Sequence, residues 1–276
     1  MKTIFLAAGF LPLACPFFAQ ETFAQVQGPR IATLEPSLQK KTQSLNSRYL
    51  VFSPKRKSKL KLPLLVYLHG AGGLGDEIRK IQGQAVKVWQ GVQKFGKDPC
   101  IVIAPQCSRM TKRGQRGGWI PEDLNLLLQQ LKATLPVDDK RIYLTGNSMG
   151  GYGSWAWGAH SPEHFAAIAP VVGGIGPDGP KDVTPDLEKW AANLAKVPVY
   201  AFAGAKDKVV PAERSQRMVN AIRKAGGKRA KLQIYPNEGH GASRIVFSTP
   251  AFYDWMFSKK RDATDRKPAA NRDRKP

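Results

Sequence analysis

Short apolar runs alternate with helix-periodic segments through most of the chain, and this alternation constrains the fold more than any other feature. Continuous apolar runs of this length are typical of strands that are buried on both faces of a sheet. Their alternation with amphipathic helices predicts an α/β domain over 48–258, with a mostly parallel central sheet and helices on both faces. The expected strands are 48–52, 62–70, 100–106, 141–147, 165–173, 197–205 and 230–236, and the expected helices are 76–95, 121–135, 149–161, 185–196, 211–227 and 250–257.

The first 24 residues resemble a secretory signal. Lys2 precedes an apolar run, and Thr22 and Ala24 provide the small residues of a cleavage site. This pattern predicts an exported protein, periplasmic or secreted. Prolines within the apolar run argue against a membrane-spanning helix, so no transmembrane segment is expected in the mature chain. A lipid anchor on Cys15 is the less favoured alternative, because Pro12 fits such a site poorly.

Two further segments flank the predicted domain. A polar segment over 25–47 leads into it. The residues 259–276 alternate charges with proline and contain no apolar side chain larger than alanine, which predicts a basic disordered tail.

The chain is strongly basic, with 43 Lys and Arg against 21 Asp and Glu and a formal net charge of +22. Basic residues concentrate at 54–61 and in the tail, and neither segment interleaves them with aromatic residues. Stacking on single-stranded nucleic acid needs such aromatics. We therefore expect no nucleic-acid partner, and a contact with an anionic envelope or polysaccharide instead.

The cysteines indicate neither a disulfide nor a metal site in the mature chain. Cys100 and Cys107 flank a predicted strand, so they lie more than about 20 Å apart. A disulfide needs Cα atoms within about 7 Å. No further cysteine or histidine is near them in sequence, so no metal is expected and no cofactor is implied.

One pentad predicts a nucleophile. Gly146-Asn147-Ser148-Met149-Gly150 follows a predicted strand and fits the G-x-S-x-G nucleophile elbow, in which serine lies on a strained strand-to-helix turn. The alternative is an ordinary helix cap, which explains the serine but not the two glycines. A serine hydroxyl attacks only when a base takes its proton and a third group orients that base.

His240 and Asp207 are the candidates for base and acid. Each follows a predicted strand, as Ser148 does, and the three occur in the chain order Ser, Asp, His that this kind of hydrolase uses. Asp207 alone has a simpler explanation, because aspartate commonly initiates turns.

Other acids and histidines remain as alternatives. Asp178, Asp182 and Asp186 are rival acids in a proline-rich connection. His160 and His164 follow the helix of the nucleophile and are interpreted as surface or helix-end residues.

The oxyanion of an acyl-transfer reaction needs preorganised backbone N–H donors. Met149 should supply one at the start of its helix. The glycine-rich loop 68–75 should supply the second, and it contains neither G-x-G-x-x-G nor a G-K-[ST] ending, which disfavours a phosphate-binding loop. His69 is expected to brace this loop.

Five stretches together resemble the α/β-hydrolase superfamily, and in particular its compact phospholipase/carboxylesterase, dienelactone hydrolase-like and feruloyl-esterase-like branches. They are LVYLHGAGG, CIVIAPQC, RIYLTGNSMGGYGSW, FAGAKDKVVP and YPNEGHG. The resemblance covers about 48–258 and implies a triad of Ser148, Asp207 and His240, with Ala71 and Met149 as backbone donors.

The resemblance also suggests pocket residues. The loop after CIVIAPQC resembles one in which secreted esterases place glutamine and tryptophan near the nucleophile, so Gln106 and Trp119 are candidates. No long insertion is present, and no large lid is expected. Ser148 stands where dienelactone hydrolases proper carry cysteine.

These features predict an exported serine esterase that cleaves small-molecule or polymer-linked esters through an acyl-enzyme on Ser148. A serine peptidase or an acyltransferase of the same fold uses the same triad and is the alternative. A basic envelope-binding protein is the alternative outside the enzymes.

Overall fold

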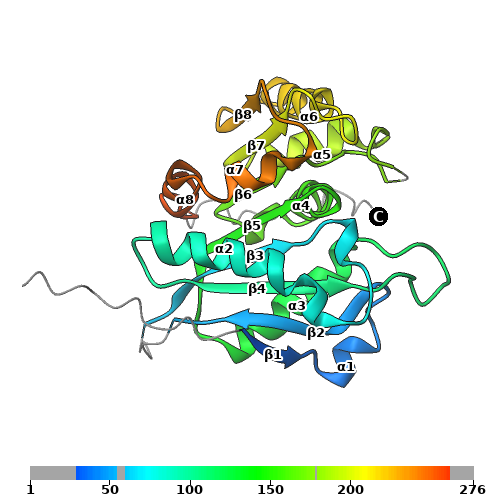
Figure 1. Ribbon diagram of the computed structural model, residues 1–276, viewed down its shortest axis with the longest axis vertical. Coiled ribbons are helices and arrows are strands. Elements are labelled where there is room, and N and C mark those ends of the chain that lie inside the picture. The colour runs from blue at the N-terminus through cyan, green and yellow to red at the C-terminus, as the bar shows by residue number, and fades with distance from the viewer. Residues whose placement is uncertain (1–28, 55–59, 178, 262–276) are drawn as a thin grey trace, which may run out of the picture.

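The inner apolar runs form the strands of one sheet. The computed structural model describes residues 29–54, 60–177 and 179–261. Within these residues the sheet has eight strands in the order β1-β2-β4-β3-β5-β6-β7-β8 (Figure 1). The pairs β1–β2 and β2–β4 are antiparallel, and all other neighbours are parallel. The strands are β1 (Arg30–Thr33), β2 (Leu45–Phe52), β3 (Leu62–Leu68), β4 (Ile101–Cys107), β5 (Val137–Asn147), β6 (Ala167–Val171), β7 (Val199–Gly204) and β8 (Ala230–Tyr235).

Helices cover both faces of this sheet, because its inner strands are apolar on both sides. In β3, Leu64 and Val66 belong to one core, and Leu65 and Tyr67 belong to the other. Helices α3, α4, α5 and α6 pack into the first core and α2, α7 and α8 into the second. The α-helices are α1 (Pro36–Gln39), α2 (Gln82–Phe95), α3 (Pro121–Thr134), α4 (Met149–His160), α5 (Leu187–Leu194), α6 (Ala212–Lys224), α7 (Ser243–Val246) and α8 (Pro250–Phe257). The predicted fold class is confirmed.

The order of the strands fixes where a ligand site can form. The chain leaves β3 through α2 to reach β4 on one side, and it later returns to the other side of β3 as β5. Connections that diverge in this way leave a crevice at the carboxyl ends of the strands. The crevice lies between the ends of β3 and β5, where the glycine-rich loop and Ser148 follow.

The sheet begins earlier than the predicted domain boundary at residue 48. The segment predicted to lead into the domain contains β1, which pairs with β2 from Arg30↔Val51 onward. The carboxylate of Asp123 in α3 accepts backbone hydrogen bonds from Gln43, Ser44 and Leu45. The described part of this segment is therefore built into the sheet and the first helical layer.

The largest other differences from the predicted boundaries are at the starts of α2 and β5. The helix predicted over 76–95 starts as a 3-10 turn, η2 (Ile78–Ile81), and becomes α-helical at Gln82. Strand β5 starts at Val137, before the predicted 141.

The described start of the predicted tail packs against the domain. The Tyr143 hydroxyl donates to the Lys259 carbonyl at 2.8 Å, and the Arg261 N–H donates to the Lys140 carbonyl at 2.9 Å. Residues 262–276 and the predicted signal over 1–24 lie outside the described residues. None of the described helices has the length and apolarity needed to cross a membrane.

Candidate active site

Ser148 occupies a strained turn between β5 and α4. Its φ is 57° and its ψ is −119°, in a region that side-chain-bearing residues rarely adopt. The turn is held by its N–H, which donates to the Val171 carbonyl at 3.0 Å. The two flanking positions have no room for a side chain. A Cβ at Gly146 would overlap the Gly150 carbonyl, and a Cβ at Gly150 would overlap the Leu68 carbonyl. The G-x-S-x-G spacing thus lets α4 start against the end of β3.

A chain of hydrogen bonds joins the three residues predicted as a triad. His240 lies in η4 (His240–Ala242), and its Nε2 is 2.8 Å from Ser148 Oγ. Its Nδ1 is 2.8 Å from Asp207 Oδ2. A carboxylate can only accept, so Nδ1 carries the proton and Nε2 is free to accept from the serine hydroxyl. The site can therefore take a proton from Ser148.

Asp207 is fixed by the turn after β7. Its side chain is fully buried, and its Oδ1 accepts from the N–H groups of Val209 at 2.8 Å and Val210 at 2.9 Å. Its other oxygen contacts His240. Of the rival acids, Asp186 lies at the start of α5, Asp182 lies in a turn against Gly176, and Asp178 lies outside the described residues. The acid that contacts His240 is Asp207.

The two predicted oxyanion donors, Ala71 and Met149, each lie at the start of a helical turn. Met149 is the first residue of α4, where an N–H has no intrahelical acceptor. Ala71 opens η1 (Ala71–Gly73), which begins three residues after the end of β3. A Cβ placed on Gly70 would lie 3.4 Å from the Ser148 Cβ, so this turn abuts the nucleophile.

The His69 side chain stabilises this turn by hydrogen bonds, as the sequence predicts. It is fully buried, its Nδ1 lies 2.7 Å from the Gly70 carbonyl, and its Nε2 accepts from the Cys107 N–H at 3.1 Å. Since Nε2 accepts, Nδ1 carries the proton that bonds the carbonyl. Burial lowers the pKa of His69 to about 4, so the ring is neutral at neutral pH.

Gln106 and Trp119 are predicted as pocket residues. In the structure their side chains instead donate hydrogen bonds to backbone carbonyls in and beside the glycine-rich loop after β3. The Gln106 amide is fully buried and donates to the Gly73 carbonyl at 2.8 Å and the Glu77 carbonyl at 3.0 Å. The Trp119 indole donates to the His69 carbonyl at 3.1 Å. Neither lines the cavity at Ser148. Buried polar groups need partners, and the loop carbonyls provide them.

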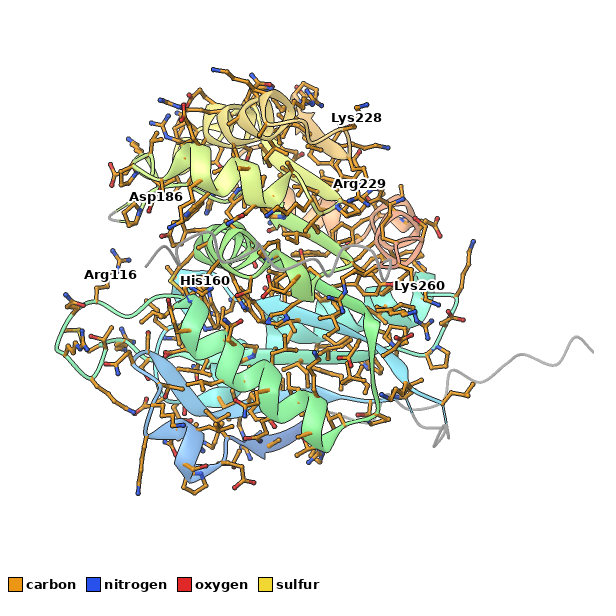
Figure 2. All side chains as sticks on the ribbon, turned by 180° about the vertical axis from the view of Figure 1, so that it is seen from behind. Arg116, His160, Asp186, Lys228, Arg229 and Lys260 are labelled. Carbon is orange, nitrogen blue, oxygen red and sulfur yellow. The ribbon has the colours of Figure 1, made fainter. Side chains whose placement is uncertain are left out.

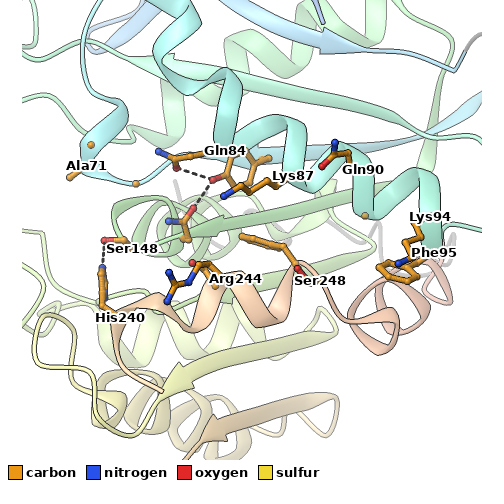
Figure 3. A pocket seen from close by; sticks show the side chains of 17 residues that line it. Ala71, Gln84, Lys87, Gln90, Lys94, Phe95, Ser148, His240, Arg244 and Ser248 are labelled. Carbon is orange, nitrogen blue, oxygen red and sulfur yellow. Dashed lines mark hydrogen bonds between the residues drawn. The ribbon is translucent and has the colours of Figure 1, made fainter. Parts of the chain in front are cut away.

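A pocket of about 700 Å³ extends from Ser148 and His240 between α2 and α7. Figure 3 shows these two residues at one end and Lys94 and Phe95 at the other. Sequence reasoning missed most of its lining, which comprises Tyr67, Gly70, Ala71, Gly72, Gln84, Lys87, Gln90, Gly91, Lys94, Phe95, Asn147, Ser148, His240, Ser243, Arg244, Phe247 and Ser248.

The hydroxyl of Tyr67 is the centre of a hydrogen-bonded group in the pocket wall beside Ser148. The Tyr67 hydroxyl lies 2.6 Å from Asn147 Oδ1 and 3.1 Å from Gln84 Oε1. Burial raises the pKa of Tyr67, so the hydroxyl keeps its proton and can donate. These contacts tie β3, the elbow and α2 together.

The remaining histidines lie away from this pocket. His160, at the end of α4, contacts Glu122 at 3.1 Å and is visible on the opposite side of the molecule (Figure 2). His164 lies 3.8 Å from Glu163. In the part of the chain that the structure describes, no group of three or more His, Cys, Asp or Glu residues could hold a metal ion.

Comparison with known proteins identifies a hydrolase family and esterases as the relatives of this chain. A model of the Dienelactone hydrolase family matches residues 104–246, just over half of the chain, and this range contains Ser148, Asp207 and His240. A protein named "Probable feruloyl esterase C" from Aspergillus terreus is 25% identical over 219 residues, which cover 76% of this chain and 73% of that protein.

Solved structures agree on the fold. The crystal structure of a thermostable esterase has a TM-score of 0.69 and 25% identity, and the match covers 86% of this chain and 64% of that one. A ferulic acid esterase has a TM-score of 0.60 at 16% identity, and the match covers 84% of this chain and 98% of that one. The chain thus spans less than two thirds of the thermostable esterase.

Proposed function

The chain belongs to the dienelactone hydrolase family and is a carboxylic-ester hydrolase, and we propose that it acts through an acyl-enzyme on Ser148. The observation that carries this proposal is the unbroken hydrogen-bond chain from Ser148 Oγ through His240 to the buried Asp207. Such a chain is what an unreactive hydroxyl needs to become a nucleophile at neutral pH.

The geometry supports the following reaction. Ser148 Oγ attacks the ester carbonyl carbon while its proton passes to His240 Nε2, and Asp207 stabilises the imidazolium that forms. The N–H groups of Ala71 and Met149 receive the oxyanion, each contributing about 3 kcal/mol to lowering the barrier. The alcohol leaves with the proton from His240. Water then attacks the acyl-enzyme with His240 as base, which releases the acid and restores the serine.

The experiment that tests this mechanism traps the acyl-enzyme. Mixing the enzyme with p-nitrophenyl acetate should give a burst of nitrophenolate, and mass spectrometry should place an acetyl group on Ser148. In His240→Ala the burst should be lost while the fold is kept. An acetyl group on another residue, or hydrolysis without any acylated serine, would contradict the mechanism.

Assays with a matched peptide amide and with an added alcohol separate the two alternatives that use the same triad. A serine peptidase would cleave matched peptide amides at rates that approach those of the esters. An acyltransferase would pass the acetyl group to an added alcohol in preference to water. We expect hydrolysis of esters to dominate over both reactions.

We expect a preference for short acyl groups. The pocket surface as a whole is more apolar than polar, but the wall that α2 contributes is polar and charged and carries Lys87, Gln90 and Lys94. A long acyl chain would lie against groups that favour water. A series of p-nitrophenyl esters should give kcat/KM values that fall with increasing chain length, and a maximum beyond about ten carbons would contradict this expectation.

We also propose that residues 1–24 direct export. The support is the pattern of a charged start, an apolar run and small residues at the cleavage site. Expression in a bacterial host followed by N-terminal sequencing should find mature protein outside the cytoplasm that begins near Gln25. Retention of Met1 on all of the protein would argue against it.

A further inference from the structure

One wall of the pocket is a polar and cationic stripe on α2. Gln84, Lys87, Gln90 and Lys94 recur every three or four residues, so they share one helix face. From Gln84 to Lys94 this face extends roughly 15 Å along the helix axis. The pocket is therefore a groove that continues well beyond the space that a short acyl group needs.

The groove carries positive charge without compensation. Lys87, Lys94 and Arg244 line it, and its lining contains no aspartate or glutamate. All three side chains are exposed, and within the described residues none of them forms an ion pair. A cleft lined by one sign of charge concentrates oppositely charged ligands.

Arg244 lies toward the Ser148 end of the groove, Lys94 lies at the far end, and Lys87 lies between them (Figure 3). Arg244 lies against Gly241, the residue after His240: a Cβ placed there would lie 3.0 Å from the arginine Nη2. Lys94 lies 5.2 Å from the centre of the Phe95 ring at the far end. A ligand that meets both cations must extend along the groove.

The uncharged lining combines apolar surface, from residues such as Phe95 and Phe247, with hydrogen-bonding groups, and a sugar presents both kinds of surface. Gln90, Ser243 and Ser248 offer amide and hydroxyl groups that can both donate and accept hydrogen bonds. Phe95 offers a ring on which the apolar face of a sugar can pack. A lipid chain would require a continuous apolar wall, and the stripe on α2 is polar.

We propose that the groove binds an anionic polysaccharide and presents its ester-bearing unit to Ser148. This inference rests on the proposed ester hydrolysis and names its substrate class. The anionic groups, carboxylates or sulfates, contact Lys87 and Lys94 on α2 and Arg244 on α7, and the sugar hydroxyls meet the amides and serines between them.

The test measures competition with a small neutral substrate. Oligogalacturonate, oligomeric dextran sulfate, neutral maltodextrin and vesicles of an anionic lipid are each added to p-nitrophenyl acetate assays with the full chain. Both anionic oligosaccharides are candidates, and we expect at least one of them to compete while maltodextrin does not. Competition by the carboxylate probe alone identifies uronates, and competition by the sulfate probe alone identifies sulfated sugars. Inhibition should weaken as salt is raised, because these charges are exposed.

Charge-reversal variants locate the binding. In K87E/K94E the inhibition constant should rise about tenfold or more. The matched control K228E/K231E has the same change in net charge and should keep the wild-type constant. Lys228, labelled in Figure 2, precedes β8, Lys231 lies at the start of β8, and neither lines the groove. Circular dichroism checks that both variants fold, and K87Q/K94Q replaces K87E/K94E if the latter does not.

The outcomes separate this inference from the proposed function. Equal inhibition by maltodextrin, equal loss in both double variants, or competition by anionic lipid vesicles alone would overturn the groove assignment while leaving ester hydrolysis intact. If p-nitrophenyl acetate is not hydrolysed, calorimetric titration of the same probes into the same variants still decides whether the groove binds them. Binding that K87E/K94E does not weaken would then overturn the inference.

Discussion

Asp207 is the buried end of the hydrogen-bond chain that starts at Ser148. We expect Asp207→Asn to lower kcat by up to about 10⁴-fold, because an amide at this position favours the wrong tautomer of His240. The fold should persist, because Asn can still accept the N–H groups of Val209 and Val210. Steady-state kinetics with circular dichroism and melting temperature measures both effects.

The rival acids provide the controls. Asp182→Asn and Asp186→Asn should keep most of the wild-type kcat, because the acid that contacts His240 is Asp207. If one of them lost activity while Asp207→Asn kept it, the acid would come from the connection before α5 instead.

His69 makes stability depend on pH. Its pKa of about 4 in the folded protein lies below the ordinary value of 6.5, so the unfolded chain binds more protons between these values. The free energy of unfolding should therefore fall as pH drops from about 6.5 to 4, by roughly 3 kcal/mol from this group. Denaturant titrations at several pH values measure the slope.

A variant without the imidazole isolates the contribution of His69. In His69→Gln the slope between pH 6.5 and 4 should be shallower than in the wild type, although the variant is less stable at neutral pH. A slope in His69→Gln as steep as in the wild type would mean that other groups cause it.

At the scale of elements, the contact between α4 and β3 sets the position of the nucleophile. A Cβ on Gly150 would overlap the Leu68 carbonyl, which belongs to the backbone and cannot rotate away. We expect Gly150→Ala to destabilise the protein by about 2 kcal/mol or more and to lower kcat through displacement of Ser148. Thermal unfolding and kinetics on p-nitrophenyl acetate check both effects.

The matched control is the same substitution on α2. Gly83 has no atom within 4 Å of the position that a Cβ would take. Gly83→Ala should stabilise the protein by about 0.5–1 kcal/mol, because alanine costs less backbone entropy in a helix. Destabilisation by Gly83→Ala comparable to that of Gly150→Ala would show that packing at the elbow is not the cause.

Most elements could be predicted from the sequence because each carries its own periodicity. The inner strands are continuous apolar runs, and helices such as α3 and α6 bury one face. Strand β1 could not be predicted: it has four largely exposed residues and depends on pairing with β2. The 3-10 start before α2 was missed because its apolar residues fit a helical period as well.

In the site, too, residues with a local sequence signal could be predicted, and residues that act through distant contacts could not. Ser148, Asp207 and His240 could be placed together because each follows a strand, and the carboxyl ends of parallel strands meet at one edge. The support role of Gln106 depends on carbonyls of a loop about thirty residues earlier in the chain. The walls of the groove come from α2 and α7, which are distant in sequence and line one pocket only in the folded protein.

At the scale of the whole molecule, the sheet order brings every part of the site to one edge. Strands β3, β5 and β7 lead into the proposed oxyanion loop, the proposed nucleophile Ser148 and the proposed acid Asp207, and His240 follows β8. The net charge of +22 is distributed over the chain, and the groove places Lys87, Lys94 and Arg244 in the same pocket as Ser148. Catalysis and recognition of the substrate are therefore expected on the same face.

The central claim is that Ser148 is the activated nucleophile, and labelling with a fluorophosphonate probe tests it most directly. The probe forms a covalent bond only with a serine that a neighbouring base activates. We predict that the wild-type protein is labelled at Ser148, that Ser148→Ala is not labelled, and that His240→Ala is labelled far more slowly. Labelling of Ser148→Ala at the wild-type rate, or no labelling of folded wild-type protein, would contradict the account.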